Sequence, residues 1–256
     1  MCIAYLSLGH PHWPVLVAAN RDEFHHRPTA PLGPWPEHPG ILAGRDLQAG
    51  GTWMGCTRDG RFALLTNYRE PAAAVPAHAP SRGALVRDYL LADADPKSWM
   101  SELASKAQAL AGYNLIVGSR REWWYYSNRD PQPGPHPLAP GRYVVSNHLL
   151  DTPWPKARRL RAALDALPAA HWVRQPEDVL ARLRDTTPAT DGELPQTGLA
   201  PAFERLLSSP FIISPDYGTR SSSILAMGID GSLLFCEQSH DAAGRPTERH
   251  DWRINR

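Results

Sequence analysis

Two Asp-Gly pairs, Asp59-Gly60 and Asp230-Gly231, constrain the fold of this chain more than any other feature of its sequence. A two-residue turn of this kind needs positive φ at its central residues, which Asp and Gly tolerate, and it joins neighbouring antiparallel strands. Short runs rich in apolar residues flank both pairs. The sequence therefore predicts two β-hairpins, formed by residues 52–58 with 61–68 and by residues 222–229 with 232–238.

Strand-like and helical patterns alternate in groups along the rest of the chain. A third hairpin is expected from 2–8 and 15–19, because the intervening 9-GHPHWP-14 carries a glycine and two prolines that suit a turn. Such an order, with mostly hairpin connections, predicts an α+β fold in which helices cover the outer faces of antiparallel sheets. Further strands are expected at 113–119, 122–127, 142–147 and 211–214, and helices at about 81–91, 98–112, 154–167, 175–185 and 201–207.

Length and charge limit the class of protein. We expect a single domain over residues 1–256, because no linker divides the chain. The 27 basic and 26 acidic residues are scattered and leave a formal charge of +1, so neither nucleic acid nor an anionic membrane surface is expected as a partner. A membrane span needs about 20 apolar residues, and no run reaches that length. We therefore expect a cytoplasmic protein whose partner is a small molecule.

The metal-binding residue types give no coherent pattern. The three cysteines are widely spaced without a Cys-x-x-Cys pair, which supports neither a disulfide framework nor a structural zinc site. The 11 histidines include no pair that is spaced for one face of a predicted helix and joined by a carboxylate ligand. We expect no metal and no cofactor.

A cysteine stands at position 2, directly behind Met1, at the start of a strand-like run. Removal of Met1 would give Cys2 a free α-amine beside its thiol. An α-amine titrates at about 7.7–8.0 and a free thiol at about 8.5, so the amine can accept the thiol proton at little cost near neutral pH. This is the chemistry of an N-terminal nucleophile. Alternatively, Cys2 is a small apolar residue that opens a strand.

The first hairpin favours the nucleophile interpretation. If its turn is centred between Pro11 and His12, paired residue numbers sum to 23 and Cys2 lies opposite Arg21; a half-residue shift places it opposite Asp22. Directly opposed Cβ atoms lie about 4.5–5.5 Å apart. A guanidinium at that distance would lower the pKa of the thiol, and a carboxylate could orient the α-amine.

Strand geometry limits what the tetrad 20-NRDE-23 can contribute. Alternate residues face opposite ways, so Asn20 and Asp22 share one face while Arg21 and Glu23 share the other. A charged strand end often forms only a surface ion pair. The coincidence with Cys2 makes us prefer a functional site.

Two glycine-containing segments are further binding candidates. In 50-GGTW-53, Gly51 would permit close approach of a ligand or of the Cys2 strand, with Thr52 and Trp53 beside it. A bulge or tight turn with a core tryptophan explains the same residues. In 218-GTRS-221, Arg220 could hold an anion or carboxylate, or form a structural ion pair.

The motifs taken together resemble the NRDE family, which includes the transport and Golgi organisation two proteins. The resemblance extends in order over nearly the whole chain. It rests on the Met-Cys start, 20-NRDE-23, 50-GGTWMG-55, 67-NYRE-70, 81-SRG-83, 146-SNHLLDTPWPK-156 and 217-YGTRSSSIL-225.

This resemblance implies an N-terminal nucleophile hydrolase fold, a four-layer αββα sandwich of two antiparallel sheets. It also implies that Arg21 and Asp22 act beside the nucleophile and that Asn147 completes an oxyanion site, with Asn67 either joining it or capping a turn. Because Arg21 and Asp22 are adjacent and face opposite ways, Asn20 or Glu23 could hold either role. We count all four tetrad residues among the site candidates.

Two hypotheses about function follow. In the first, the protein is an N-terminal-cysteine hydrolase of an amide or (thio)ester bond in a small molecule. In the second, which the resemblance also allows, it is a non-catalytic binding or trafficking protein for haem, acyl-CoA or a related amphiphile. Both would use one pocket between the sheets.

Overall fold

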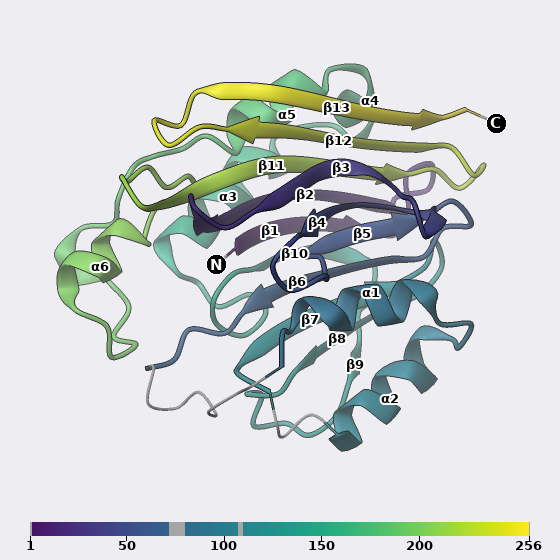
Figure 1. Cartoon of the computed structure of the whole chain (residues 1–256), viewed down its shortest axis with the longest axis horizontal. Coiled ribbons are helices and arrows are strands. Elements are labelled where there is room, and N and C mark those ends of the chain that lie inside the picture. Colours follow the sequence, from purple (N-terminus) through teal and green to yellow (C-terminus); the bar gives the residue numbers. More distant parts are fainter. Residues whose placement is uncertain (1, 72–79, 107–109, 256) are drawn as a thin grey trace.

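The chain forms two antiparallel β-sheets stacked face to face (Figure 1) in a computed structural model that describes residues 2–71, 80–106 and 110–255. The first sheet has the order β10-β1-β2-β11-β12-β13 and the second has the order β3-β4-β5-β6-β7-β8-β9. The first sheet contains β1 (Cys2–Leu8), β2 (Val15–Phe24), β10 (Gly141–Val145), β11 (Tyr217–Met227), β12 (Leu233–His240) and β13 (Pro246–Ile254). The second contains β3 (Thr29–Trp35), β4 (His38–Asp46), β5 (Met54–Thr57), β6 (Phe62–Asn67), β7 (Tyr113–Gly118), β8 (Trp123–Ser127) and β9 (His136–Pro137).

The alternation of side chains along the strands creates the layers. In β1, Ala4 and Leu6 point into the core between the sheets, whereas Ile3 and Tyr5 point to the opposite face and pack under helices. The central strands are apolar on both faces because both faces are covered. A second apolar cluster lies under α3 (Pro155–Asp165), α4 (Ala169–Arg174) and α5 (Pro176–Arg182).

The outer face of the second sheet is covered by α1 (Gly83–Leu91) and α2 (Pro96–Lys106). Figure 1 shows α6 (Pro201–Leu206) away from these layers, ahead of β11, where Tyr217 packs with Leu207. The prediction of an α+β, four-layer αββα sandwich is confirmed. Among the described residues, the helices are all too short or too polar to cross a membrane.

All three predicted hairpins are present. The two Asp-Gly turns join β5 to β6 and β11 to β12, and their glycines adopt positive φ, 103° at Gly60 and 92° at Gly231. Asp59 and Asp230 do not, so the expected two-residue turn with positive φ at both central residues is wrong: strand pairing stops at Cys56 with Phe62 and at Met227 with Leu233, and the loops are longer. In the hairpin of β1 and β2, Cys2 pairs with Arg21. The register with residue numbers that sum to 23 is therefore correct, and the shifted register is not.

Four strands of the sheets were not predicted from the sequence. One of them, β9, has only two residues and lies in a segment rich in proline. β3 contains Pro31 and Pro34, which argue against a strand, but it lies at the edge of its sheet, where a missing N–H is tolerated. Its hairpin partner β4 was missed with it. β13 is mostly polar and lies at the edge of the other sheet, where charged residues are common.

Two other expectations need correction or restriction. The predicted strand at 211–214 is wrong: Phe211 and Ile212 are buried in irregular backbone, where the Phe211 N–H donates to the Asp185 carbonyl and the Ile212 N–H donates to the side chain of Thr219. The helix expected over 98–112 is α2, and residues 107–109 of that range lie outside the described residues.

Candidate active site

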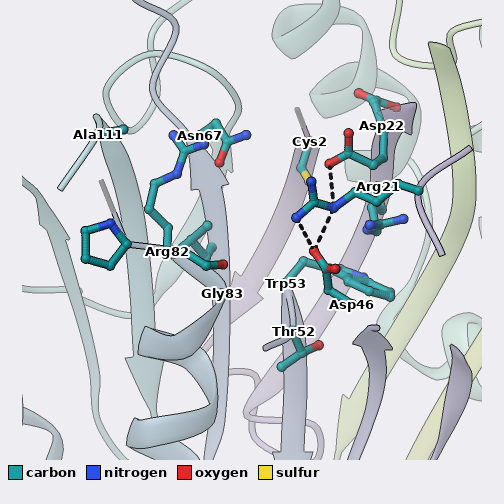
Figure 2. A pocket seen from close by; sticks show the side chains of 15 residues that line it. Cys2, Arg21, Asp22, Asp46, Thr52, Trp53, Asn67, Arg82, Gly83 and Ala111 are labelled. Atoms are coloured by element: carbon teal, nitrogen blue, oxygen red, sulfur yellow. Dashed lines mark hydrogen bonds and ion pairs between the residues drawn. The ribbon is translucent and has the colours of Figure 1, made fainter. Parts of the chain in front are cut away.

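A pocket of about 360 Å³ opens at the edge of the sandwich where β1 begins and where β2, β4 and β6 end. Figure 2 shows Arg82 and Asn67 on one side of this pocket, and Cys2 with Arg21 and Asp22 on the other. The sheet ends therefore bring residues from distant parts of the sequence around the Cys2 thiol. The lining residues are Cys2, Arg21, Asp22, Glu23, Arg27, Asp46, Thr52, Trp53, Leu65, Asn67, Pro80, Ser81, Arg82, Gly83 and Ala111.

Arg21 is held in place opposite Cys2. Its side chain lies on the face of β2 that points between the sheets, the face that Ala19 also occupies. The guanidinium carbon is 4.3 Å from the centre of the Trp53 ring, and Nη1 donates to Thr29 Oγ1 at 3.2 Å. Stacking and burial fix this cation beside the thiol, and no carboxylate of the described residues lies in ion-pair contact with it.

Asp22 points to the opposite face of β2 and is buried. Its Oδ1 accepts a hydrogen bond of 2.7 Å from Thr219 Oγ1 on β11. Burial raises the pKa of Asp22, while the nearby Lys156 ammonium and the Thr219 hydrogen bond oppose that rise. A carboxyl group in this position can accept hydrogen bonds from an amine at the start of β1.

The thiol of Cys2 is half-buried and borders the pocket. Burial raises the pKa of Cys2 and the Asp22 carboxylate raises it further, whereas Arg21 and a hydrogen bond from the Asp22 backbone N–H lower it. Burial is the largest of these effects, so the surroundings favour the thiol over the thiolate. Nucleophilic attack therefore needs a base.

Asn147 lies behind the pocket wall. β1 pairs with β10 up to Ala4 and Val145, and the same register continued by two residues would place Asn147 beside Cys2. Asn147 is fully buried, and its Nδ2 donates to the Asn67 carbonyl at 3.1 Å. Asn67 lines the pocket. The two asparagines proposed from the sequence therefore lie in contact, with Asn67 at the pocket and Asn147 behind it.

The first and last residues of the tetrad, Asn20 and Glu23, differ in whether they border the pocket. Asn20 does not border the pocket; its Nδ2 donates to the carbonyls of Leu183 and Pro210, each at 2.8 Å. Asn20 thus ties β2 to the segments that follow α5 and α6. Glu23 does border the pocket, where it lies 3.9 Å from Arg27.

Of the two glycine-containing segments, 50–53 and 218–221, only the first contributes side chains to the pocket. Thr52 and Trp53 line the pocket, but Gly51 does not: the Cβ of any other residue there would lie 2.4 Å from the Gly83 carbonyl carbon at the start of α1. The close approach expected at Gly51 is therefore made by helix backbone. Arg220 is also outside the pocket, because its Nη1 donates to three carbonyls of the turn after β2.

Sequence reasoning missed three charged residues of the pocket wall, Arg27, Asp46 and Arg82. Arg27 and Asp46 form an ion pair of 2.8 Å. Arg82 was part of the 81-SRG-83 motif but had received no role; its Nη1 donates to the Gly112 carbonyl at 2.8 Å. No local signal pointed to Arg27 or Asp46, because only the packing of the two sheets brings them together.

Sequence reasoning also gave no role to Lys156, the last residue of the motif 146–156. It is 1% exposed, and its Nζ donates to Asn147 Oδ1 at 3.0 Å. In the part of the chain that the structure describes, no three His, Cys, Asp or Glu side chains gather to hold a metal ion.

The structure is an αββα sandwich with a cysteine at the start of its first strand, facing a pocket and paired with an arginine of the second strand, as the resemblance implied. The chain belongs to the Transport and Golgi organisation 2 family, whose model matches residues 1–242.

Two relatives show the extent of this similarity. The Transport and Golgi organization protein 2 homolog of Homo sapiens is 34% identical over 242 residues, which cover 88% of this chain and 86% of that protein. The homolog of Bos taurus is 32% identical over 260 residues, covering 94% and 92% respectively. A solved structure, the Caenorhabditis elegans N-acylethanolamine-hydrolyzing acid amidase ortholog, aligns with a TM-score of 0.47 and 10% identity over 88% of this chain and 92% of that one.

Proposed function

We propose that this protein is an N-terminal-cysteine hydrolase that cleaves an amide or (thio)ester bond of a small molecule. The observation that carries the proposal is the position of Cys2: its thiol borders a polar pocket, directly opposite Arg21 and beside the Asp22 backbone N–H. A cysteine with only a packing role would not need a buried cation and a hydrogen-bond donor beside its sulfur.

The chemistry starts with removal of Met1, which frees the α-amine of Cys2. The amine accepts the thiol proton, and the sulfur attacks the substrate carbonyl carbon to form a C–S bond. The tetrahedral intermediate collapses when the bond to the leaving nitrogen, oxygen or sulfur breaks and the ammonium returns the proton to that atom. Water then attacks the acyl-enzyme with the same amine as base, and the carboxylic acid leaves as the thiol is restored.

The asparagines suit the negative charge that develops on the carbonyl oxygen. Asn67 borders the pocket, and Asn147 contacts the Asn67 carbonyl from the side away from the pocket. Preorganised amide donors of this kind contribute roughly 10²–10³-fold to acyl transfer. Arg21 supports the thiolate that forms before attack.

The walls of the pocket favour a small, polar substrate that carries a negative charge. Arg27 forms an ion pair with Asp46, whereas Arg21 and Arg82 have no carboxylate in ion-pair contact among the described residues. The apolar side chains of the lining are those of Trp53, Leu65, Pro80 and Ala111. A carboxylate on the substrate would pair with Arg82 across the pocket from Cys2.

The test uses protein expressed with its native, untagged N-terminus. We expect an intact mass without Met1, labelling of Cys2 by small acylating reagents, and turnover of a panel of amides and thioesters. Cys2→Ala should abolish labelling and turnover, while the buried Cys236 serves as control: Cys236→Ala should leave both unchanged. Equal turnover by the Cys2→Ala variant would refute the proposal.

The alternative function, binding or trafficking of haem, acyl-CoA or a related amphiphile, predicts saturable binding that survives Cys2→Ala and no acyl-enzyme with any substrate. The charged walls around Cys2 favour a small polar ligand over a long acyl chain or a porphyrin. Titration with these ligands, with and without Cys2, separates the two functions.

A further inference from the structure

Lys156 is a buried cation inside the candidate site. It is the second residue of α3 and is 1% exposed. Among the described residues, no carboxylate lies within ion-pair distance of its Nζ, and the polar group that it contacts is Asn147 Oδ1 at 3.0 Å. The Trp154 ring lies 5.9 Å from Nζ and offers it a weak cation–π contact.

Such a residue is costly for the folded state. An ammonium loses its hydration on burial, and an apolar side chain of the same length would fill the space without that loss. Burial lowers the pKa of Lys156 to about 7, although Asp22 and Cys2 act in the opposite direction. A lysine that only packed α3 against the sheet would not explain this position.

The lysine fixes the orientation of the Asn147 amide. Lys156 Nζ donates to the Asn147 oxygen, and in its charged form it has no acceptor that could take a hydrogen from the amide nitrogen instead. The amide nitrogen then points the other way, to the Asn67 carbonyl at 3.1 Å. That bond uses one of its two hydrogens, and the second has no acceptor among the described residues.

Ser146 connects this pair to the nucleophile. Its hydroxyl lies 3.2 Å from Asn147 Oδ1 and donates to the Cys2 carbonyl at 2.9 Å. Lys156 is thus hydrogen-bonded to Asn147, and Ser146, which donates its one proton to the Cys2 carbonyl, packs against the same Asn147 oxygen. A rotation of the Asn147 amide by half a turn would point its oxygen at the pocket wall and remove the N–H donor from that side.

We propose that Lys156 is a positioning residue for acyl transfer: by donating to Asn147 Oδ1 it holds the Asn147 N–H toward the wall where the carbonyl oxygen of the substrate gains negative charge. The inference rests on the proposed function, because the oxyanion belongs to that reaction. It adds a residue that acts through Asn147 and does not contact the substrate.

The test compares two reactions of the same thiol in protein with a native N-terminus. Iodoacetamide alkylates Cys2 without an oxyanion, whereas p-nitrophenyl acetate acylates it through one, so the ratio of the two rates at one pH cancels differences in thiolate content. Peptide mass spectrometry measures both rates at Cys2. Lys156→Met should lower the acylation-to-alkylation ratio about tenfold or more, as Asn147→Ala should.

Two controls isolate the effect. Lys97→Met makes the same substitution in α2, away from the pocket, and should leave the ratio unchanged. Lys156→Gln keeps an N–H that can donate to Asn147 and should recover most of the ratio. If Lys156→Met does not fold, Lys156→Leu takes its place.

An unchanged ratio in the folded Lys156→Met or Lys156→Leu variant overturns the inference, whatever Asn147→Ala does. A ratio that falls in these variants and recovers in Lys156→Gln supports it. Neither reagent is a natural substrate, so the outcome is separate from that of the proposed function. If Cys2 is acylated with the expected ratios but the protein hydrolyses no amide or thioester, the inference about Lys156 holds and the proposed function is wrong.

Discussion

The replacement Asn20→Ala tests the assignment of the first tetrad residue to structure and not to substrate binding. Asn20 is 1% exposed, and its amide makes three hydrogen bonds. Two go to the carbonyls of Leu183 and Pro210, each at 2.8 Å, and the third is accepted from Ser222 Oγ at 2.7 Å. Each partner comes from a different segment.

The expected loss of stability follows from these bonds. A buried hydrogen bond contributes about 1–1.5 kcal/mol, and alanine leaves the two carbonyls without a donor. The third bond costs less to lose, because Ser222 Oγ also contacts His240 Nε2 at 3.0 Å. We expect the free energy of unfolding to fall by about 3 kcal/mol, a large part of the roughly 5–15 kcal/mol of an ordinary domain.

Urea unfolding followed by circular dichroism measures this loss as a lower midpoint with an unchanged m value. The matched control is Glu23→Gln, at the other end of the tetrad, where an ion pair of 3.9 Å predicts less than about 1 kcal/mol. The rate of Cys2 alkylation in the folded Asn20→Ala protein should equal that of the unsubstituted protein. A stability loss below about 1 kcal/mol together with a slower Cys2 would refute the reasoning and return Asn20 to the site.

Other predictions concern pH, a buried ion pair and a close backbone contact. Burial lowers the pKa of His240 to about 4 from 6.5, so between these pH values the unfolded chain binds a proton at this side chain and the native state does not. The free energy of unfolding should therefore decrease by about 3 kcal/mol as the pH is lowered from 7 to 4. Urea titrations at several pH values should show this fall, and His240→Gln should reduce it. Glu204→Gln removes the charge that pairs with buried Arg69 and should lower the free energy of unfolding by about 3–5 kcal/mol, whereas a loss below 1 kcal/mol would contradict the pairing. Gly51→Ala drives a Cβ into the Gly83 backbone and should cost about 1–3 kcal/mol in the same assay while slowing Cys2 alkylation; normal values for both would show that α1 can shift freely.

The parts of the fold that sequence could predict are those set by local geometry. The register of β1 and β2 followed from the position of one turn, since pairing in a hairpin is fixed once its centre is known, and it placed Cys2 opposite Arg21 correctly. The Asp-Gly turns gave two more hairpins for the same reason. β3 and β13 were missed because edge strands tolerate prolines and charges that a central strand would not.

The candidate site was only partly accessible from sequence. Residues on β1 and β2 could be placed relative to Cys2 because hairpin pairing determines their distance. Arg82 and the Arg27–Asp46 pair could not, since their positions depend on how the sheets stack and where α1 begins, which periodicity does not specify. Lys156 was missed because a lysine in the first turn of a helix is ordinarily solvated, whereas this one points into the protein.

The adjacency of Arg21 and Asp22 in sequence is explained by where Cys2 stands. Neighbouring residues of a strand face opposite ways, so a partner in mid-strand could contact only one of the two side chains. Cys2 is the first residue of β1. In the proposed mechanism, with Met1 removed, it would offer a thiol to the inter-sheet face, where Arg21 lies, and an α-amine at the strand end, next to the residue whose carboxyl occupies the other face of β2. The Asp22 backbone N–H meanwhile bonds the sulfur. A strand terminus is the place where one residue could contact both charged side chains, which is the arrangement that the proposed mechanism requires.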